Sequence, residues 1–138
     1  MKLTASLEAP CDVAELFGWV EELERYAQWL TILTDVEPDG DGWRVELRGK
    51  LGLLARSKRL RMERTEHLPN ELVTFERRET DGRNHANWTL HATVAPTSTG
   101  SHLVMDLGYE GRLWGTVLEG LLSDEIDQAK KRLLKLVS

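Results

Sequence analysis

Apolar and polar residues alternate at the start of the chain, which is typical of a strand with one buried face. Residues 2–8 place Leu3, Ala5 and Leu7 on the same side. Because Pro10 cannot donate to a strand ladder, we expect the strand to end before it.

Two short helices are predicted after this strand. Asp12 is followed three residues later by a glutamate, which is the capping-box pattern of a helix start. Apolar residues then recur at helical spacing, at Val13, Leu16, Phe17 and Val20. A second short helix is predicted over residues 21–29, with its inward side at Leu23, Tyr26 and Trp29.

Six further strands are predicted, because short segments with apolar alternation are separated by turn residues such as Asp39-Gly40-Asp41-Gly42. Tight turns join strands that pair antiparallel. The expected strands are 31–38, 43–50, 54–66, 71–80, 84–95 and 101–110.

A long helix is predicted after Gly111 and extends to the C-terminus. Its apolar residues form one stripe: Leu113, Val117, Leu121, Leu122, Ile126, Ala129, Leu133 and Leu136. An antiparallel sheet commonly has one apolar face, and this helix is the only predicted element large enough to cover it. We therefore predict an α+β helix-grip fold, in which a curved antiparallel sheet of about seven strands surrounds the C-terminal helix. Residues 1–138 are expected to form one domain.

The composition predicts a globular protein of a reducing compartment. The single cysteine, Cys11, allows no disulfide within the chain. The N-terminus lacks the apolar core of a signal peptide, and no run approaches the roughly 20 apolar residues of a membrane span. We expect a cytoplasmic protein. A net charge of −5 disfavours binding to nucleic acid through bulk charge. The oligomeric state stays open between monomer and dimer.

Two arginines fall on the apolar side of adjacent predicted strands. Arg64 shares the parity of Met62, and Arg77 shares the parity of Phe75. An unpaired buried charge is strongly unfavourable, so each arginine must be paired, lie at a cavity mouth or reach solvent through its long stem. Glu79 is a candidate partner for either.

Residues 7–30 (LEAPCDVAELFGWVEELERYAQWL) resemble the opening of the START-like superfamily. The matching features are Ala9-Pro10, Val13, Phe17, Leu23-Glu24-Arg25-Tyr26, Trp29 and, further on, Glu63-Arg64-Thr65. That superfamily includes the birch-pollen-allergen fold, aromatic polyketide cyclases and dehydratases, and coenzyme-Q-binding proteins. The resemblance covers essentially the whole chain and looks closest to small actinobacterial, cyclase/dehydrase-like members. It implies a helix-grip fold with an apolar cavity between the sheet and the last helix.

The first functional hypothesis is binding or transport of a hydrophobic small molecule such as a lipid, an isoprenoid or a polyketide. It depends on the apolar sheet face, the five tryptophans and the lack of a catalytic set. The residues expected to contact the ligand are Phe17, Tyr26, Trp29, Leu33, Met62, Phe75, Trp88, Leu90, Met105, Leu107, Tyr109, Leu113, Val117 and Leu121.

The alternative is a polyketide cyclase or dehydratase. By resemblance, Arg64 and Arg77 match a cavity arginine pair that would stabilise enolate oxygens as carbon bonds form. The matching tyrosine position falls at Leu33, so a candidate proton donor is missing and the binding hypothesis is favoured.

A third hypothesis is a toxin-like or regulatory interaction protein. Residues 48–64 contain seven basic residues and one acid, and strand parity directs Arg59 and Arg61 to the water-facing side. A solvated strand surface is the simpler interpretation of this charge run.

No metal or cofactor is predicted. His85 and His91 share one face of a predicted strand, but no cysteine or carboxylate completes a zinc-binding spacing. There is also no glycine-rich phosphate loop.

Overall fold

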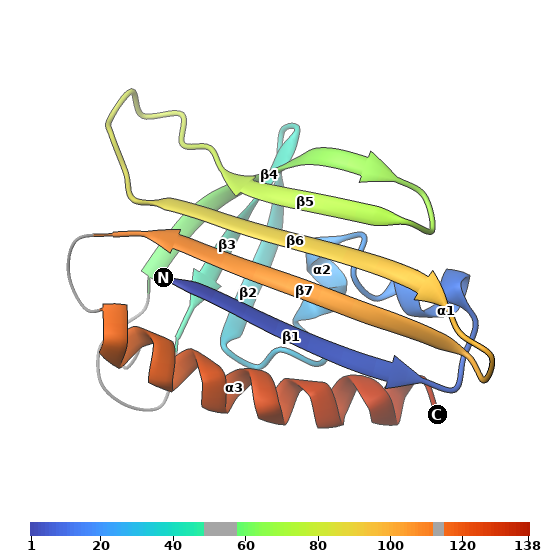
Figure 1. Cartoon of the computed structure of the whole chain (residues 1–138). Coiled ribbons are helices and arrows are strands. Elements are labelled where there is room, and N and C mark those ends of the chain that lie inside the picture. Colours follow the sequence, from blue (N-terminus) through green and yellow to red (C-terminus); the bar gives the residue numbers. More distant parts are fainter. Residues whose placement is uncertain (49–57, 112–114) are drawn as a thin grey trace.

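A seven-stranded antiparallel sheet curves around one long helix in the computed structural model of the chain (Figure 1). The structure describes residues 1–48, 58–111 and 115–138, with side chains from residue 119 onward in the last segment. The strands are β1 (Lys2–Ala9), β2 (Leu33–Asp39), β3 (Gly42–Leu47), β4 (Lys58–Leu68), β5 (Leu72–Arg77), β6 (Asn87–Pro96) and β7 (Ser101–Glu110). The helices are α1 (Val13–Gly18), α2 (Leu23–Tyr26) and α3 (Gly115–Leu136). The predicted α+β helix-grip arrangement is confirmed.

The strands follow one another across the sheet in the order β1-β7-β6-β5-β4-β3-β2. Strands β2 to β7 form a meander, as the tight turns predicted. Gly40 has a φ of 60° in the β2–β3 turn, a conformation that glycine adopts without steric cost. The first strand pairs with the last, from Lys2 opposite Gly108 to Ala9 opposite Ser101. This pairing joins the two ends of the chain and leaves β1 and β2 as the sheet edges.

The two short helices connect β1 to β2. The side chain of Asp12 accepts a hydrogen bond from the backbone N–H of Glu15 at 2.8 Å, which confirms the predicted start of α1. The second helix is shorter than the predicted 21–29. The helix α2 is only four residues long, and Glu22 at its start makes no side-chain cap.

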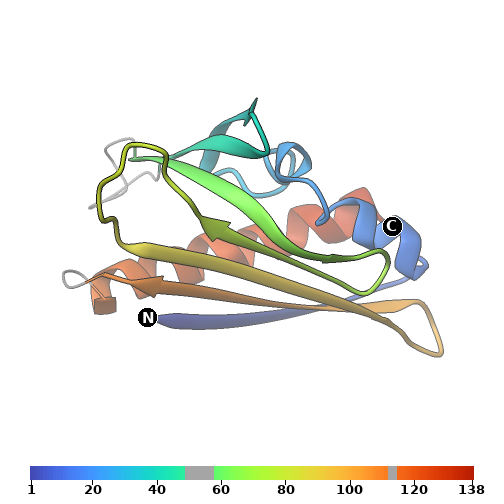
Figure 2. The same ribbon diagram turned by 90° about the horizontal axis from the view of Figure 1, so that it is seen from above.

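The helix α3 runs along the open side of the curved sheet, from the end near the start of β1 to the end near α1 (Figure 1). Seen from above, the strands β4 and β5 lie over it (Figure 2). Leu122, Ala129 and Leu133 are buried, which agrees with the predicted apolar stripe, whereas Leu136 at the end of that stripe is exposed. Gly111 precedes the helix, as predicted, and Leu113 lies outside the described residues.

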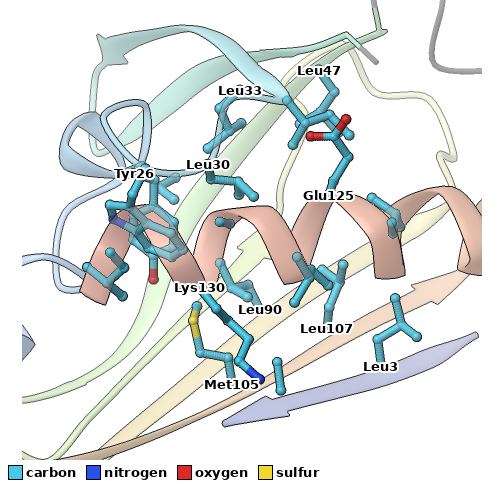
Figure 3. A pocket seen from close by; sticks show the side chains of 18 of the residues that line it. Leu3, Tyr26, Leu30, Leu33, Leu47, Leu90, Met105, Leu107, Glu125 and Lys130 are labelled. Atoms are coloured by element: carbon cyan, nitrogen blue, oxygen red, sulfur yellow. The ribbon is translucent and has the colours of Figure 1, made fainter. Parts of the chain in front are cut away.

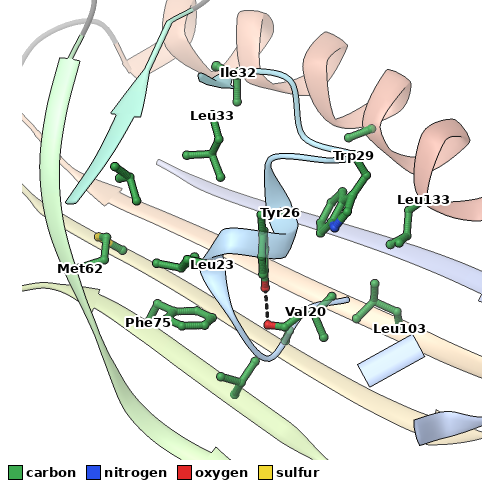
Figure 4. Packing of buried hydrophobic residues seen from close by; sticks show 14 of the residues in the cluster. Val20, Leu23, Tyr26, Trp29, Ile32, Leu33, Met62, Phe75, Leu103 and Leu133 are labelled. Carbon is green, nitrogen blue, oxygen red and sulfur yellow. Dashed lines mark hydrogen bonds between the residues drawn. The ribbon is translucent and has the colours of Figure 1, made fainter. Parts of the chain in front are cut away.

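The core lies between the sheet, α3 and the short helices (Figure 4). Tyr26 is fully buried at its centre, and its hydroxyl donates a hydrogen bond to the carbonyl of Val20 at 2.8 Å. The ring of Phe75 meets the Tyr26 ring edge-on, with centroids 6.0 Å apart. These contacts attach α2 to the inner face of the sheet, which is the face turned toward α3.

The outer face of the sheet corrects one sequence-based expectation. Arg61 does not face water, since only 5% of its surface is exposed. Its guanidinium pairs with Asp39 at 3.1 Å and with Glu63, and it donates to the carbonyl of Arg78 at 3.1 Å. Strand parity predicted the face correctly but could not predict that neighbouring carboxylates would enclose the side chain. Arg59 is exposed as expected.

Candidate functional site

An apolar cavity of about 130 Å³ lies between the inner face of the sheet and α3 (Figure 3). Its wall is formed by side chains of β1, β3, β4, β6, β7, the α2–β2 region and α3. Because side chains alternate along each strand, the strands contribute mainly every second residue, as β1 does with Leu3, Ala5 and Leu7, although Ser6 also reaches the wall. The wall is almost entirely hydrocarbon, so the cavity suits an apolar occupant.

Eight of the predicted ligand-contacting residues line this cavity. They are Tyr26, Trp29, Leu33, Met62, Trp88, Leu90, Met105 and Leu107. The strand periodicity located those on β4, β6 and β7, because parity alone decides which side chains face inward.

The other predicted contacts lie elsewhere. Phe17 stacks parallel to the His67 ring at 6.0 Å, and Phe75 packs in the core against Tyr26; neither reaches the cavity wall. Tyr109 and Leu121 are also absent from the described wall. Leu113 and the side chain of Val117 lie outside the described residues.

Several lining residues were not among the predicted contacts. They include Leu3, Ala5 and Leu7 of β1, Leu23, Leu30 and Ile32, Val45, Leu47, Leu60 and Leu103 of the other strands, and Leu122, Ile126, Ala129 and Leu133 of α3. A signal for them existed in the alternation of residues 2–8 and in the apolar stripe of the last helix. Only the pairing of β1 with β7 places the first strand beside this stripe.

The polar groups of the cavity differ in whether they have partners. The Tyr26 hydroxyl is bound to Val20, and burial raises the pKa of Tyr26 far above its ordinary value. Trp29 Nε1 donates to the carbonyl of Trp19 at 3.2 Å. Trp88 Nε1 is buried and has no hydrogen-bond partner among the described residues. Glu125 and Lys130 of α3 contribute to the wall as well (Figure 3).

Arg77 lies on the inner face but not in the described cavity wall. Its Nε donates to Glu79 Oε2 at 2.8 Å, with only 9% and 11% of the two side chains exposed. Its Nη1 donates to the carbonyl of Ala86 at 3.2 Å. Burial raises the pKa of Glu79, but hydrogen bonds from Arg77 and from the Arg61 N–H outweigh it and leave the pKa low. The expected pairing with Glu79 is thus confirmed for Arg77.

Arg64 has different partners from those of Arg77. Its Nη1 donates to the carbonyl of Glu21 at 2.9 Å, and its guanidinium carbon lies 5.9 Å from the centroid of the Trp43 ring. Arg64 is also absent from the described cavity wall. It therefore links β4 to the segment between α1 and α2.

Lys58, at the start of β4, is a further cation on the inner face. Its Nζ lies 5.5 Å from the centroid of the Tyr109 ring and 5.9 Å from that of Trp88. Burial and the charge of Arg77 lower the pKa of Lys58. A Cβ atom at Gly111 would overlap the Tyr109 ring, so a glycine there lets this ring take its place beside Lys58.

No group of three His, Cys, Asp or Glu side chains suited to a metal ion occurs in the described part of the chain. Within the same residues, no helix has the length and apolar character needed to cross a membrane.

The fold and the cavity together define a helix-grip protein with an apolar interior site. The chain belongs to the polyketide cyclase / dehydrase and lipid transport family, whose model matches residues 1–137. The resemblance to the START-like superfamily is thereby confirmed. No curated protein matches the chain in sequence.

Solved structures share the fold at low sequence identity. A START superfamily protein of Mycobacterium smegmatis superposes with a TM-score of 0.74 at 14% identity, covering 99% of this chain and 96% of that one. A protein of Chromobacterium violaceum reaches a TM-score of 0.73 at 15% identity over 99% and 96% of the two chains. A conserved protein of Geobacillus kaustophilus reaches 0.69 at 18% identity over 98% and 96%.

Proposed function

We propose that the protein binds a hydrophobic small molecule in the cavity between the sheet and α3. The observation that carries this proposal is the cavity wall, which is built from leucine, aromatic and methionine side chains contributed by both layers. Burying an apolar ligand there removes its surface from water, which favours binding by a free energy of roughly 25 cal/mol for each Å² of apolar surface buried. The family description, which includes lipid transport, supports the same function.

The size of the cavity limits the enclosed part of the ligand. A volume of about 130 Å³ is close to that of the roughly 150 Å³ engineered cavity that holds benzene. The part of the ligand enclosed by the described walls is therefore about one ring or a short branched chain. This matches a segment of an isoprenoid, a lipid or a polyketide.

Binding is preferred over cyclase or dehydratase chemistry because of the two arginines. A guanidinium that stabilises an enolate needs donors aimed at the reacting oxygen. Arg64 instead donates a hydrogen bond to the carbonyl of Glu21, and Arg77 donates to the carboxylate of Glu79 and to the carbonyl of Ala86. Leu33 contributes only hydrocarbon to the wall.

The proposal is tested with the neutral fluorescent probe N-phenyl-1-naphthylamine. We expect saturable binding to the wild-type protein and at least a tenfold weaker binding to Ala5→Phe, which places a ring where a methyl group now lines the cavity. The matched control is Lys2→Phe, which adds the same ring to an exposed position of the same strand and should bind like the wild type. Equal affinity in Ala5→Phe, or no saturable binding to the wild type, would contradict the proposal.

A further inference from the structure

One polar atom at the cavity wall, Trp88 Nε1, is buried and unpaired among the described residues. Trp88 is 4% exposed and lines the cavity, yet its Nε1–H has no partner among the described residues. The indole N–H groups of Trp29 and Trp43 are both used, by the carbonyl of Trp19 and by Glu24. A buried donor without an acceptor is unfavourable, and a ligand or a bound water is a common acceptor for such a group.

A positive charge lies next to the ring that carries this donor. Lys58 Nζ is 5.9 Å from the centroid of the Trp88 ring, and no carboxylate in the described ranges forms an ion pair with it. The other cation on this part of the inner face, Arg77, is neutralised by Glu79 at 2.8 Å. Among the described residues, the contacts of the Lys58 ammonium are with the faces of two aromatic rings, Trp88 and Tyr109. Its charge is therefore available to an anion.

We propose that the bound molecule is an apolar carboxylate, with one head-group oxygen accepting from Trp88 Nε1–H, the other facing Lys58 Nζ, and its hydrocarbon part in the cavity. This inference rests on the proposed function and names the ligand class for the same cavity. A carboxylate suits the two groups because it offers two acceptor oxygens on a single charge, and charge-assisted hydrogen bonds are the stronger kind. The hydrocarbon part would contact Leu90 and Leu107, which follow Trp88 along the cavity wall.

The charged groups of the described cavity wall belong to α3. Glu125 would repel a carboxylate, and Lys130 is an alternative cation (Figure 3). Lys58 is outside this wall, but we assign the head group to it because it lies next to the Trp88 ring, which lines the wall and carries the unpaired donor. This choice can be tested directly, since the two lysines can be neutralised one at a time.

The experiment compares an acid with its neutral analogue. 4-Phenylbutanoate and 4-phenyl-1-butanol are titrated at pH 7 to displace N-phenyl-1-naphthylamine, and the ratio of their dissociation constants is measured. The wild type should bind the acid at least tenfold more tightly than the alcohol. Lys58→Gln and Trp88→Phe should each reduce this preference about tenfold, as loss of one charge-assisted hydrogen bond predicts. Lys131→Gln, which removes the same charge at an exposed position of α3 outside the described cavity wall, should leave the preference unchanged.

Trp88→Phe keeps an aromatic ring and removes an unpaired donor, so the variant should fold, and its melting temperature checks this. Equal affinity of the wild type for acid and alcohol would overturn the carboxylate site while leaving apolar binding intact. An acid preference lost in Lys130→Gln and kept in Lys58→Gln would also overturn it. Failure of the dye itself to bind would instead reject the proposed function.

Discussion

At the scale of single residues, the best-defined charged contact is the buried pair of Arg77 and Glu79. Glu79 accepts hydrogen bonds from Arg77 Nε at 2.8 Å and from the backbone N–H of Arg61 at 3.0 Å. Both side chains are about nine-tenths buried. Breaking such a pair leaves a buried charge without compensation, which is more costly than removing both partners.

Glu79→Gln should therefore lower the free energy of unfolding by about 3 kcal/mol at pH 7. The native pKa of Glu79 lies below its ordinary value of 4.5, so the unfolded state takes up the proton first as the pH falls. The stability that Glu79 contributes is present above pH 4.5 and is lost as the pH falls through the native pKa. Urea unfolding of both proteins between pH 7 and pH 3 should show the difference shrinking in that window.

Glu76→Gln is the matched control for this prediction. Glu76 pairs with Arg78 at 3.3 Å, and both side chains are at least 35% exposed. Its loss should change the stability by less than about 0.5 kcal/mol at any pH in the series. A similar loss of stability in both variants would show that the buried pair contributes no more to the free energy of unfolding than the exposed pair does.

At the scale of elements, α3 packs on the sheet through one of its faces. Leu133 is 1% exposed and lines the cavity, whereas its neighbour Leu134 is 36% exposed. This contrast follows from helical geometry, because consecutive residues point about 100° apart and only one faces the sheet. The part of the predicted apolar stripe that contains Leu133 is therefore the face through which α3 packs on the sheet.

Leu133→Ala should lower the free energy of unfolding by about 3 kcal/mol, from lost burial and the enlarged cavity. Leu134→Ala, which removes the same atoms from the exposed side, should cost less than about 0.5 kcal/mol. The midpoints of urea unfolding measure both. Equal losses would mean that α3 does not pack on the sheet through this face.

At the scale of the whole molecule, ligand binding and stability are linked through the cavity. A ligand that binds only the folded state stabilises it by about 2.7 kcal/mol at a free concentration of 100 times its dissociation constant. For a domain of this size we expect N-phenyl-1-naphthylamine at that concentration to raise the melting temperature by about 10 °C. Differential scanning calorimetry should show the shift in the wild type and in Lys2→Phe. A shift of the same size in Ala5→Phe would place the probe outside the cavity.

Residue patterns alone predicted the elements and their inward faces. Pro10, Asp12 and the Asp39–Gly42 turn act through their own backbone and immediate neighbours, and strand parity placed Met62, Leu90 and Leu107 on the correct side. The START-like resemblance added the fold, which the structure and the family match confirm. The second helix was predicted over residues 21–29, which is too long. The helix α2 has only four residues.

The tertiary structure alone decided which inward residues reach the cavity and which charges are paired. Phe75 and Trp88 both point inward and both belong to the buried core, yet only Trp88 of the two lines the described cavity wall. The pairing of Arg77 and the buried, unpaired indole donor of Trp88 depend on strand register and on where α3 crosses the sheet. These are contacts between residues distant in sequence, and a local pattern of apolar and polar positions does not encode their geometry.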